Sequence, residues 1–249
     1  MSNEYQYSPQ RFNALPPAVK NIIIINVIVF IFGWILFKKG IVDINDYFGL
    51  HLYASSYHHV WQYITYAFLH GGVTHLLFNM FAFWMFGSVL ENVWGRKRFL
   101  LYCLVAALGA AIAQQITYYF MYHDFVAEVE RIASSPTALI NLNNQIMPKA
   151  DALSLLKSQI NSINTIGASG IVFGVLLAYG IMFPNTYVYF YFLVPIKTKW
   201  FVLGYCLLEL FYGVSGTADG VAHFAHLGGA LAGLLLILYW NKGFKRRSY

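Results

Sequence analysis

Six apolar stretches, separated by polar or basic segments, constrain this chain more than any other feature of its sequence. They run over 21–37, 73–93, 99–121, 168–183, 201–214 and 221–240. A helix of about 18 or more apolar residues is long enough to cross the hydrocarbon core of a bilayer. Because 59% of the residues are hydrophobic and only 10% are charged, too few charges remain to cover the surface of a soluble fold. The sequence predicts an all-α membrane protein with six transmembrane helices, of which the short fourth and fifth are buried among the others.

The distribution of lysine and arginine predicts the orientation of these helices. If the N-terminus lies in the cytoplasm, the inside segments hold eleven of the 16 basic residues, among them Arg96, Lys97 and Arg98. Positive charge on short loops is retained on the cytoplasmic side during insertion. We therefore expect both termini to be cytoplasmic. The net charge of +6 then reflects this topology and not a surface for nucleic acid.

The helix boundaries also define the expected domains. We expect a short cytoplasmic segment at 1–20, a six-helix membrane domain at 21–241 that begins with a retained anchor, and a basic cytoplasmic tail at 242–249. The aromatic-rich segment 49–72 is expected in the outer leaflet. An extracytoplasmic insert at 123–164 is long for a link between neighbouring helices. Apolar residues at helical spacing within it predict an amphipathic helix on the bilayer or on the protein: Leu153, Leu156, Ile160 and Ile163.

Polar side chains inside the predicted helices are few, and they are candidates for function because burying such groups in lipid is costly. Asn79, Ser169 and His226 lie on helices that run in the same direction in the six-helix topology. At a rise of 1.5 Å per residue, each lies about 22–24 Å above the inner boundary, so the three share one depth. The full set is His75, Asn79, Ser169, Glu209, His223 and His226.

Small residues next to Ser169 and His226 would allow their helices to approach closely. A hydrogen bond between serine and histidine needs about 3 Å between heavy atoms. Gly170 and Gly174 accompany Ser169, whereas Gly229 and Gly233 share the helix face of His226. Either glycine pair alone is more typical of ordinary helix packing, so only the combination favours a catalytic site.

The chemistry that these residues could perform is acyl transfer. Ser169 begins a helix, where unpaired backbone N–H groups and the helix dipole stabilise negative charge. His75 and Asn79 are four residues apart on one face and could donate to the same oxyanion. No acidic third member is evident, because Asp219 lies about 10 Å along the helix from His226. The sequence therefore predicts a Ser–His dyad.

Other interpretations of single residues remain open. A lone serine in 167–170 is more often a packing or capping residue, and a lone histidine is more often a satisfied interhelical one. For Glu209 we favour a structural role over a catalytic one, and we expect His223 to be less important for function than His226.

At these positions the chain resembles the rhomboid family of intramembrane serine proteases, from the first helix to the last. The segment Gly167-Ala168-Ser169-Gly170 resembles the family's GxSG motif, in which the serine is the nucleophile. His226 with Gly229 and Gly233 resembles its AHxxGxxxG motif, whose histidine is the base. The HxxxN motif, which helps form the oxyanion hole, is matched by His75 and Asn79, and His70 also fits its pattern. Glu91 and Gly95 resemble the ExxxG motif at the inner end of the second helix.

Two positions depart from the pattern of the family. Many rhomboids carry Trp-Arg in the first outer loop, whereas Trp61 is followed here by Gln62. Some carry a tyrosine four residues after the nucleophile, where this chain has Phe173 and so keeps the ring without its hydroxyl.

The resemblance implies a protease that cleaves single-span membrane proteins within the bilayer, without a metal or organic cofactor. We expect a multi-pass protein in contact with lipid, in a bacterial inner membrane, and make no prediction of its oligomeric state. One alternative is a non-catalytic rhomboid-like protein that binds or routes membrane clients. A second is a channel or transporter in which His70, His75, His223 and His226 ligate a metal, although no convergent acidic or thiolate partners are evident.

Overall fold

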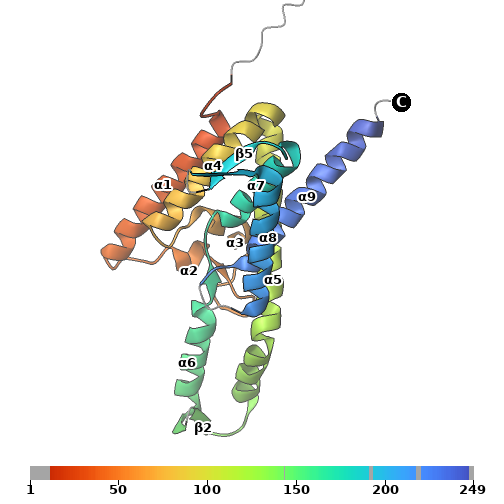
Figure 1. Cartoon of the computed structure of the whole chain (residues 1–249). Coiled ribbons are helices and arrows are strands. Elements are labelled where there is room, and N and C mark those ends of the chain that lie inside the picture. The colour runs from red at the N-terminus through yellow and green to blue at the C-terminus, as the bar shows by residue number, and fades with distance from the viewer. Residues whose placement is uncertain (1–11, 143, 191–192, 217–219, 247–249) are drawn as a thin grey trace, which may run out of the picture.

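Each of the six apolar stretches forms a helix in the computed structural model of the protein, which describes residues 12–142, 144–190, 193–216 and 220–246 (Figure 1). Within the described residues, α1, α4, α5 and α9 are long and apolar enough to cross a membrane, whereas α7 is shorter. The six helices are α1 (Pro17–Lys38), α4 (Val73–Trp94), α5 (Arg96–Ser134), α7 (Ser169–Met182), α8 (Thr198–Ser215) and α9 (His223–Arg246).

Helix α7 lies at the centre of the bundle. It packs against α4, α5, α8 and α9, and most of its residues are buried. A helix of 14 residues spans only about 21 Å, and its neighbours shield it from lipid as the sequence predicts. This burial gives the N-terminus of α7, where Ser169 lies, a fixed protein environment. The same prediction of burial is wrong for the fifth helix, α8, because most of its residues are exposed on the outside of the bundle.

The connection between α1 and α4 is ordered by hydrogen bonds. It contains α2 (Asn45–Phe48), β1 (Leu50–His51), α3 (Gln62–Thr65) and the 3-10 helix η1 (Tyr66–Phe68). Gln62, which replaces the arginine of the family's pattern, is fully buried. Its Nε2 donates to the carbonyl of Tyr57 (2.6 Å), and its Oε1 accepts from the N–H of His51 and of His59. The glutamine therefore holds this loop together through backbone contacts.

This connection also fixes the approach to α7. Strand β1 pairs antiparallel with β4 (Asn164–Thr165), with Leu50 opposite Thr165 and His51 opposite Asn164. Because β4 precedes Ser169 by only a few residues, the pairing holds the segment that leads into the helix.

The insert forms a helical hairpin that projects from the bundle (Figure 1). The third helix does not end near residue 121 as expected, because α5 continues to Ser134 and its 39 residues span about 58 Å. Val126, Val129 and Ile132 continue its apolar stripe and pack on Leu156 and Ile160 of α6 (Lys149–Ser162). The predicted amphipathic helix thus rests on protein. At the tip, β2 (Leu139–Leu142) pairs with β3 (Gln145–Pro148).

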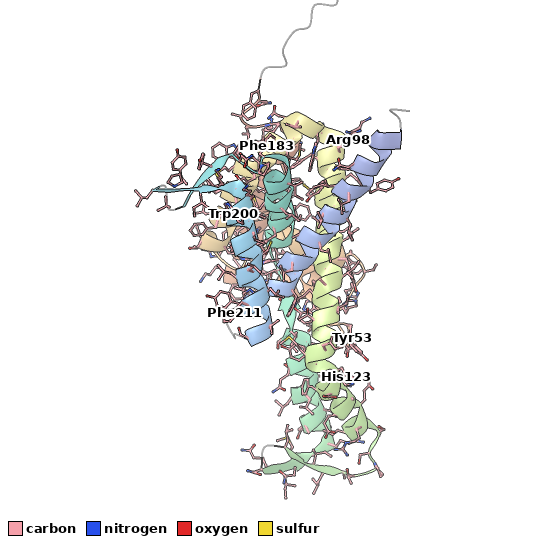
Figure 2. All side chains as sticks on the ribbon, turned by 45° about the vertical axis from the view of Figure 1, so that its right-hand side comes forward. Tyr53, Arg98, His123, Phe183, Trp200 and Phe211 are labelled. Carbon is pink, nitrogen blue, oxygen red and sulfur yellow. The ribbon has the colours of Figure 1, made fainter. Side chains whose placement is uncertain are left out.

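A second hairpin connects α7 to α8 at the opposite end of the bundle. Strand β5 (Tyr187–Phe190) pairs with β6 (Val194–Lys197), and α8 begins directly after it. Figure 2 shows Trp200, at the start of α8, on the outside of this region, and Phe211 near the other end of the same helix. The helical class predicted from the sequence does not include the three short two-stranded ribbons.

Glu91 joins α4 to the beginning of α1. Its carboxylate is buried and accepts two hydrogen bonds, from the N–H of Ala18 (2.9 Å) and of Val19 (2.8 Å). The first N–H groups of a helix have no partner within it, and the positive end of the helix dipole favours a carboxylate there. The chain then turns at Gly95, whose φ of 77° suits glycine, and enters α5.

Glu91→Gln is expected to destabilise the bundle by about 1–3 kcal/mol, because an amide can accept at only one of its two terminal atoms and a buried N–H loses its partner. The unfolding midpoint in detergent measures this effect. Glu128→Gln is the matched control, because Glu128 is exposed and pairs with Arg131 on the projecting hairpin. An equal change of midpoint in both variants would contradict the role assigned to Glu91.

Candidate active site

The side chains of Ser169 and His226 meet between α7 and α9. Ser169 is the first residue of α7, and His226 lies in the first turn of α9. The Oγ of the serine is 2.7 Å from Nε2 of the histidine, which is a short hydrogen-bond distance. His226 is buried and Ser169 is half-buried. This geometry suits a nucleophile beside a general base, the roles that the sequence predicts for the two residues.

Glycines allow the two helices to come this close. A Cβ on Gly229 would overlap the carbonyl group of Gly170, so the two backbones touch directly. A Cβ on Gly174 would lie 3.2 Å from the carbonyl oxygen of Gly229, and one on Gly233 would overlap the ring of Tyr102. The glycines singled out in the sequence therefore lie at the contact that brings serine and histidine together.

Phe173 supports the imidazole from one side. Its ring stacks on that of His226, with centroids 4.4 Å apart and planes at 6°. It also contacts Tyr205 of α8, at 4.7 Å. The stacking needs only the ring, so the missing hydroxyl does not prevent Phe173 from limiting the orientation of the base.

His75 and Ser169 border one small space at the start of α7. A Cβ on Gly167 would lie 2.8 Å from Nε2 of His75 and 3.7 Å from Oγ of Ser169. The φ of 131° at Gly167 further favours glycine. Its N–H donates to the carbonyl of Tyr66 (2.9 Å) and fixes this turn. The imidazole of His75 and the hydroxyl of Ser169 therefore border the same turn, where the sequence predicts an oxyanion hole.

Asn79 lies one turn further along α4, and its neighbours Leu76 and Met80 pack on Ala168, which precedes the serine. Its side chain is 7% exposed, and its Nδ2 has no hydrogen-bond partner in the described part of the chain. Buried amide donors are rarely left unpaired in native proteins. The free donor fits the expected role of Asn79 in binding an oxyanion.

An acidic residue, Glu209, contacts His226, whereas the sequence favours a structural role for it and predicts no acidic partner of the histidine. Oε2 of Glu209, on α8, is 2.8 Å from Nδ1 of His226 and 2.8 Å from Nδ1 of His223. The sequence carries a signal for this contact, because the height of Glu209 above the inner end of its helix can be compared with that of Ser169. Glu209 lies about 17 Å from Thr198 along α8, within about one turn of the level of Ser169. Asp219, the acidic residue that precedes His226 by seven positions, lies outside the described residues.

The same cluster is the only candidate metal site among the described residues. Ligand atoms of Glu209, His223 and His226 lie within 4.8 Å of one another. They already hydrogen-bond to each other at 2.8 Å, so their polar groups are paired without a cation. The group includes neither His70 nor His75, whose rings contact each other at 5.0 Å. The four histidines of the transporter interpretation therefore do not form one ligand set.

Comparison with known proteins identifies the family. A family model described as the rhomboid domain matches residues 57–242, about three quarters of the chain. The chain belongs to the rhomboid family. This confirms the resemblance inferred from the motifs, and the matched region of this rhomboid includes both Ser169 and His226.

Two curated relatives are proteases by name. Rhomboid protease GluP of Bacillus subtilis (strain 168) is 42% identical over 53 residues, which cover 21% of this chain and 10% of GluP. Rhomboid protease GlpG of Yersinia pestis (strain Pestoides F) is 30% identical over 63 residues, which cover 25% of this chain and 23% of GlpG. This rhomboid thus matches less than a quarter of the length of either relative.

Proposed function

We propose that this rhomboid is an intramembrane serine endopeptidase with Ser169 as nucleophile and His226 as general base. The observation that carries the proposal is the 2.7 Å contact between Oγ of Ser169 and Nε2 of His226. That contact lies between apolar helices, where a serine and a buried histidine would otherwise be costly. The names of the two relatives support the same reaction.

The reaction follows from the positions of the groups. Oγ of Ser169 attacks the carbonyl carbon of the substrate while Nε2 of His226 takes the hydroxyl proton. The negative oxygen of the tetrahedral intermediate accepts hydrogen bonds from the N–H of Ser169, His75 and Asn79. His226 then gives its proton to the leaving amine. A water, deprotonated by the same imidazole, hydrolyses the acyl-enzyme and restores the serine.

The substrates are proposed to be single-span membrane proteins. A site between apolar helices is more accessible to a segment that arrives from the lipid than to a soluble peptide. The peptide bonds of a helix are hydrogen-bonded internally, so the segment must unwind before Ser169 can attack it. Segments with helix-breaking or small residues are therefore the preferred class.

The proposed topology has six spans, with both termini cytoplasmic and the insert outside, in a bacterial inner membrane. It keeps the boundaries 1–20, 21–241 and 242–249, although α9 continues as a helix into the tail. We place a further crossing at α8, because its 18 residues span about 27 Å, although it is not among the four helices that are both long and apolar enough to cross by themselves. The basic residues of the loops support this orientation.

Cysteine labelling tests this topology. In a variant without Cys103 and Cys206, a membrane-impermeant maleimide applied to right-side-out vesicles is expected to label Lys157→Cys and not Lys97→Cys. Both positions are exposed, so the difference reports the side of the membrane. Labelling of Lys97→Cys in sealed vesicles, or protection of Lys157→Cys, would show that the orientation is wrong.

The function is tested with purified protein in detergent and in liposomes. The wild-type chain is expected to react with a fluorophosphonate probe and to cut a reporter substrate within its transmembrane segment, as mapped by mass spectrometry. An intact reporter that still binds the protein would favour the non-catalytic interpretation. Metal-dependent transport by a Ser169→Ala variant would favour the transporter.

A further inference from the structure

Glu209 is the one acidic side chain that contacts the base among the described residues, and the mechanism above does not use it. It lies on α8, a different helix from those that carry the serine and the histidine. Its side chain is 5% exposed, as deeply buried as His223 and His226 at 7%. A buried carboxylate is costly unless hydrogen bonds satisfy it, and here both neighbouring imidazoles do so.

When Glu209 is ionised, its contacts determine which nitrogen of His226 carries hydrogen. Oε2 of Glu209 lies 2.8 Å from two nitrogens, Nδ1 of His226 and Nδ1 of His223. A carboxylate oxygen can only accept, so each Nδ1 must carry the hydrogen that it donates. A neutral imidazole holds one hydrogen, and Nε2 of His226 is then the bare nitrogen. That nitrogen is the one 2.7 Å from Oγ of Ser169.

We propose that Glu209 is a positioning residue that, through Nδ1 of His226, keeps the base in the tautomer able to accept the serine proton. The site is then a Ser169–His226–Glu209 triad with His223 as a second donor to the carboxylate. The carboxylate also stabilises the imidazolium that forms when Nε2 takes the proton. The inference rests on the proposed function and adds a residue to it.

Stacking by Phe173 does not replace this role. The ring of Phe173 lies parallel to that of His226 and limits its tilt. A parallel ring does not fix the tautomer, because moving the hydrogen from Nδ1 to Nε2 leaves the imidazole, and so the stacking, where it is. The hydrogen bond to Glu209 supplies the missing constraint, since it is directed at one nitrogen.

Glu209→Gln tests the role with little change of shape. A glutamine amide can offer its NH₂ to Nδ1 and so favour hydrogen on Nε2, the tautomer that cannot act as base. We expect kcat for a reporter transmembrane substrate to fall on the order of 10²–10⁴-fold with KM nearly unchanged. Glu209→Asp, which keeps the carboxylate, is expected to fall between the wild type and Glu209→Gln. The matched control is Glu130→Gln, which makes the same change at an exposed position of α5 and is expected to leave kcat unaltered.

The tautomer itself is measured by ¹⁵N NMR of histidine-labelled protein, with the His226 signals assigned by their loss in His226→Asn. In the wild type we expect a protonated Nδ1 and a bare Nε2, and in Glu209→Gln a shift toward the reverse. A wild-type Nε2 that carries hydrogen overturns the proposal, and this NMR measurement on the wild type requires neither activity nor a folded variant. A kcat that Glu209→Gln lowers less than threefold also overturns it. A wild-type chain that shows the expected tautomer but neither cleaves nor reacts with a fluorophosphonate refutes the proposed function alone.

Discussion

Ser169→Ala is expected to abolish cleavage of the reporter substrate, with a loss on the order of 10⁴-fold or more in kcat. Alanine removes the oxygen that forms the acyl-enzyme. Among the described side chains, only Ser169 hydrogen-bonds to Nε2 of His226, so no other group is placed to replace it. Labelling by a fluorophosphonate should disappear in the same variant. The rate is measured in liposomes, with the product identified by mass, so that a contaminating protease is recognised by its different cut.

The controls separate the chemistry from folding. His226→Ala should lose activity nearly as completely, because the two residues act as a unit whose effects do not add. Ser158→Ala is the matched serine replacement, at an exposed position on α6 in the projecting hairpin, and should retain full activity. If Ser169→Ala keeps cleaving at the wild-type rate, the nucleophile is a different group and the proposed mechanism fails.

Gly229→Ala should be the most damaging of the conservative replacements, because the added methyl group must overlap the backbone of Gly170. Backbone atoms cannot rotate away as a flexible side chain can, so α9 must move relative to α7. A displacement of about 1 Å at a catalytic contact is sufficient to cost on the order of 10²-fold in rate. Overpacking of the helix interface should also lower stability by about 1–3 kcal/mol.

Both effects are measurable together. The cleavage rate and the thermal unfolding midpoint of Gly229→Ala are compared with those of Gly204→Ala. Gly204 is exposed on α8, and a Cβ there meets no atom within 4 Å. This control should keep its activity and gain slightly in helix propensity. Equal behaviour of the two variants would show that the contact between Gly229 and Gly170 does not determine the distance between the helices.

Much of the architecture is predictable because it depends on local sequence. The six apolar stretches become helices, since backbone polar groups in lipid must be satisfied within the segment. Gly229 and Gly233 lie on the same face as His226, and this follows from the spacing of the three residues along a single helix. The end of α5 was harder to predict because Val126, Val129 and Ile132 form a helix beyond the apolar stretch by packing on α6. Only the folded hairpin supplies that partner.

The sequence by itself determined the family, the helical membrane class and the residues that could perform acyl transfer, because each of these depends on residue type and spacing along the chain. The tertiary structure alone decided that Glu209 faces His226 and that Gln62 occupies the centre of the first loop. Contacts between helices depend on how far each helix is rotated and tilted against the next. The packing of the whole bundle sets those angles, so no motif within a single helix can specify them.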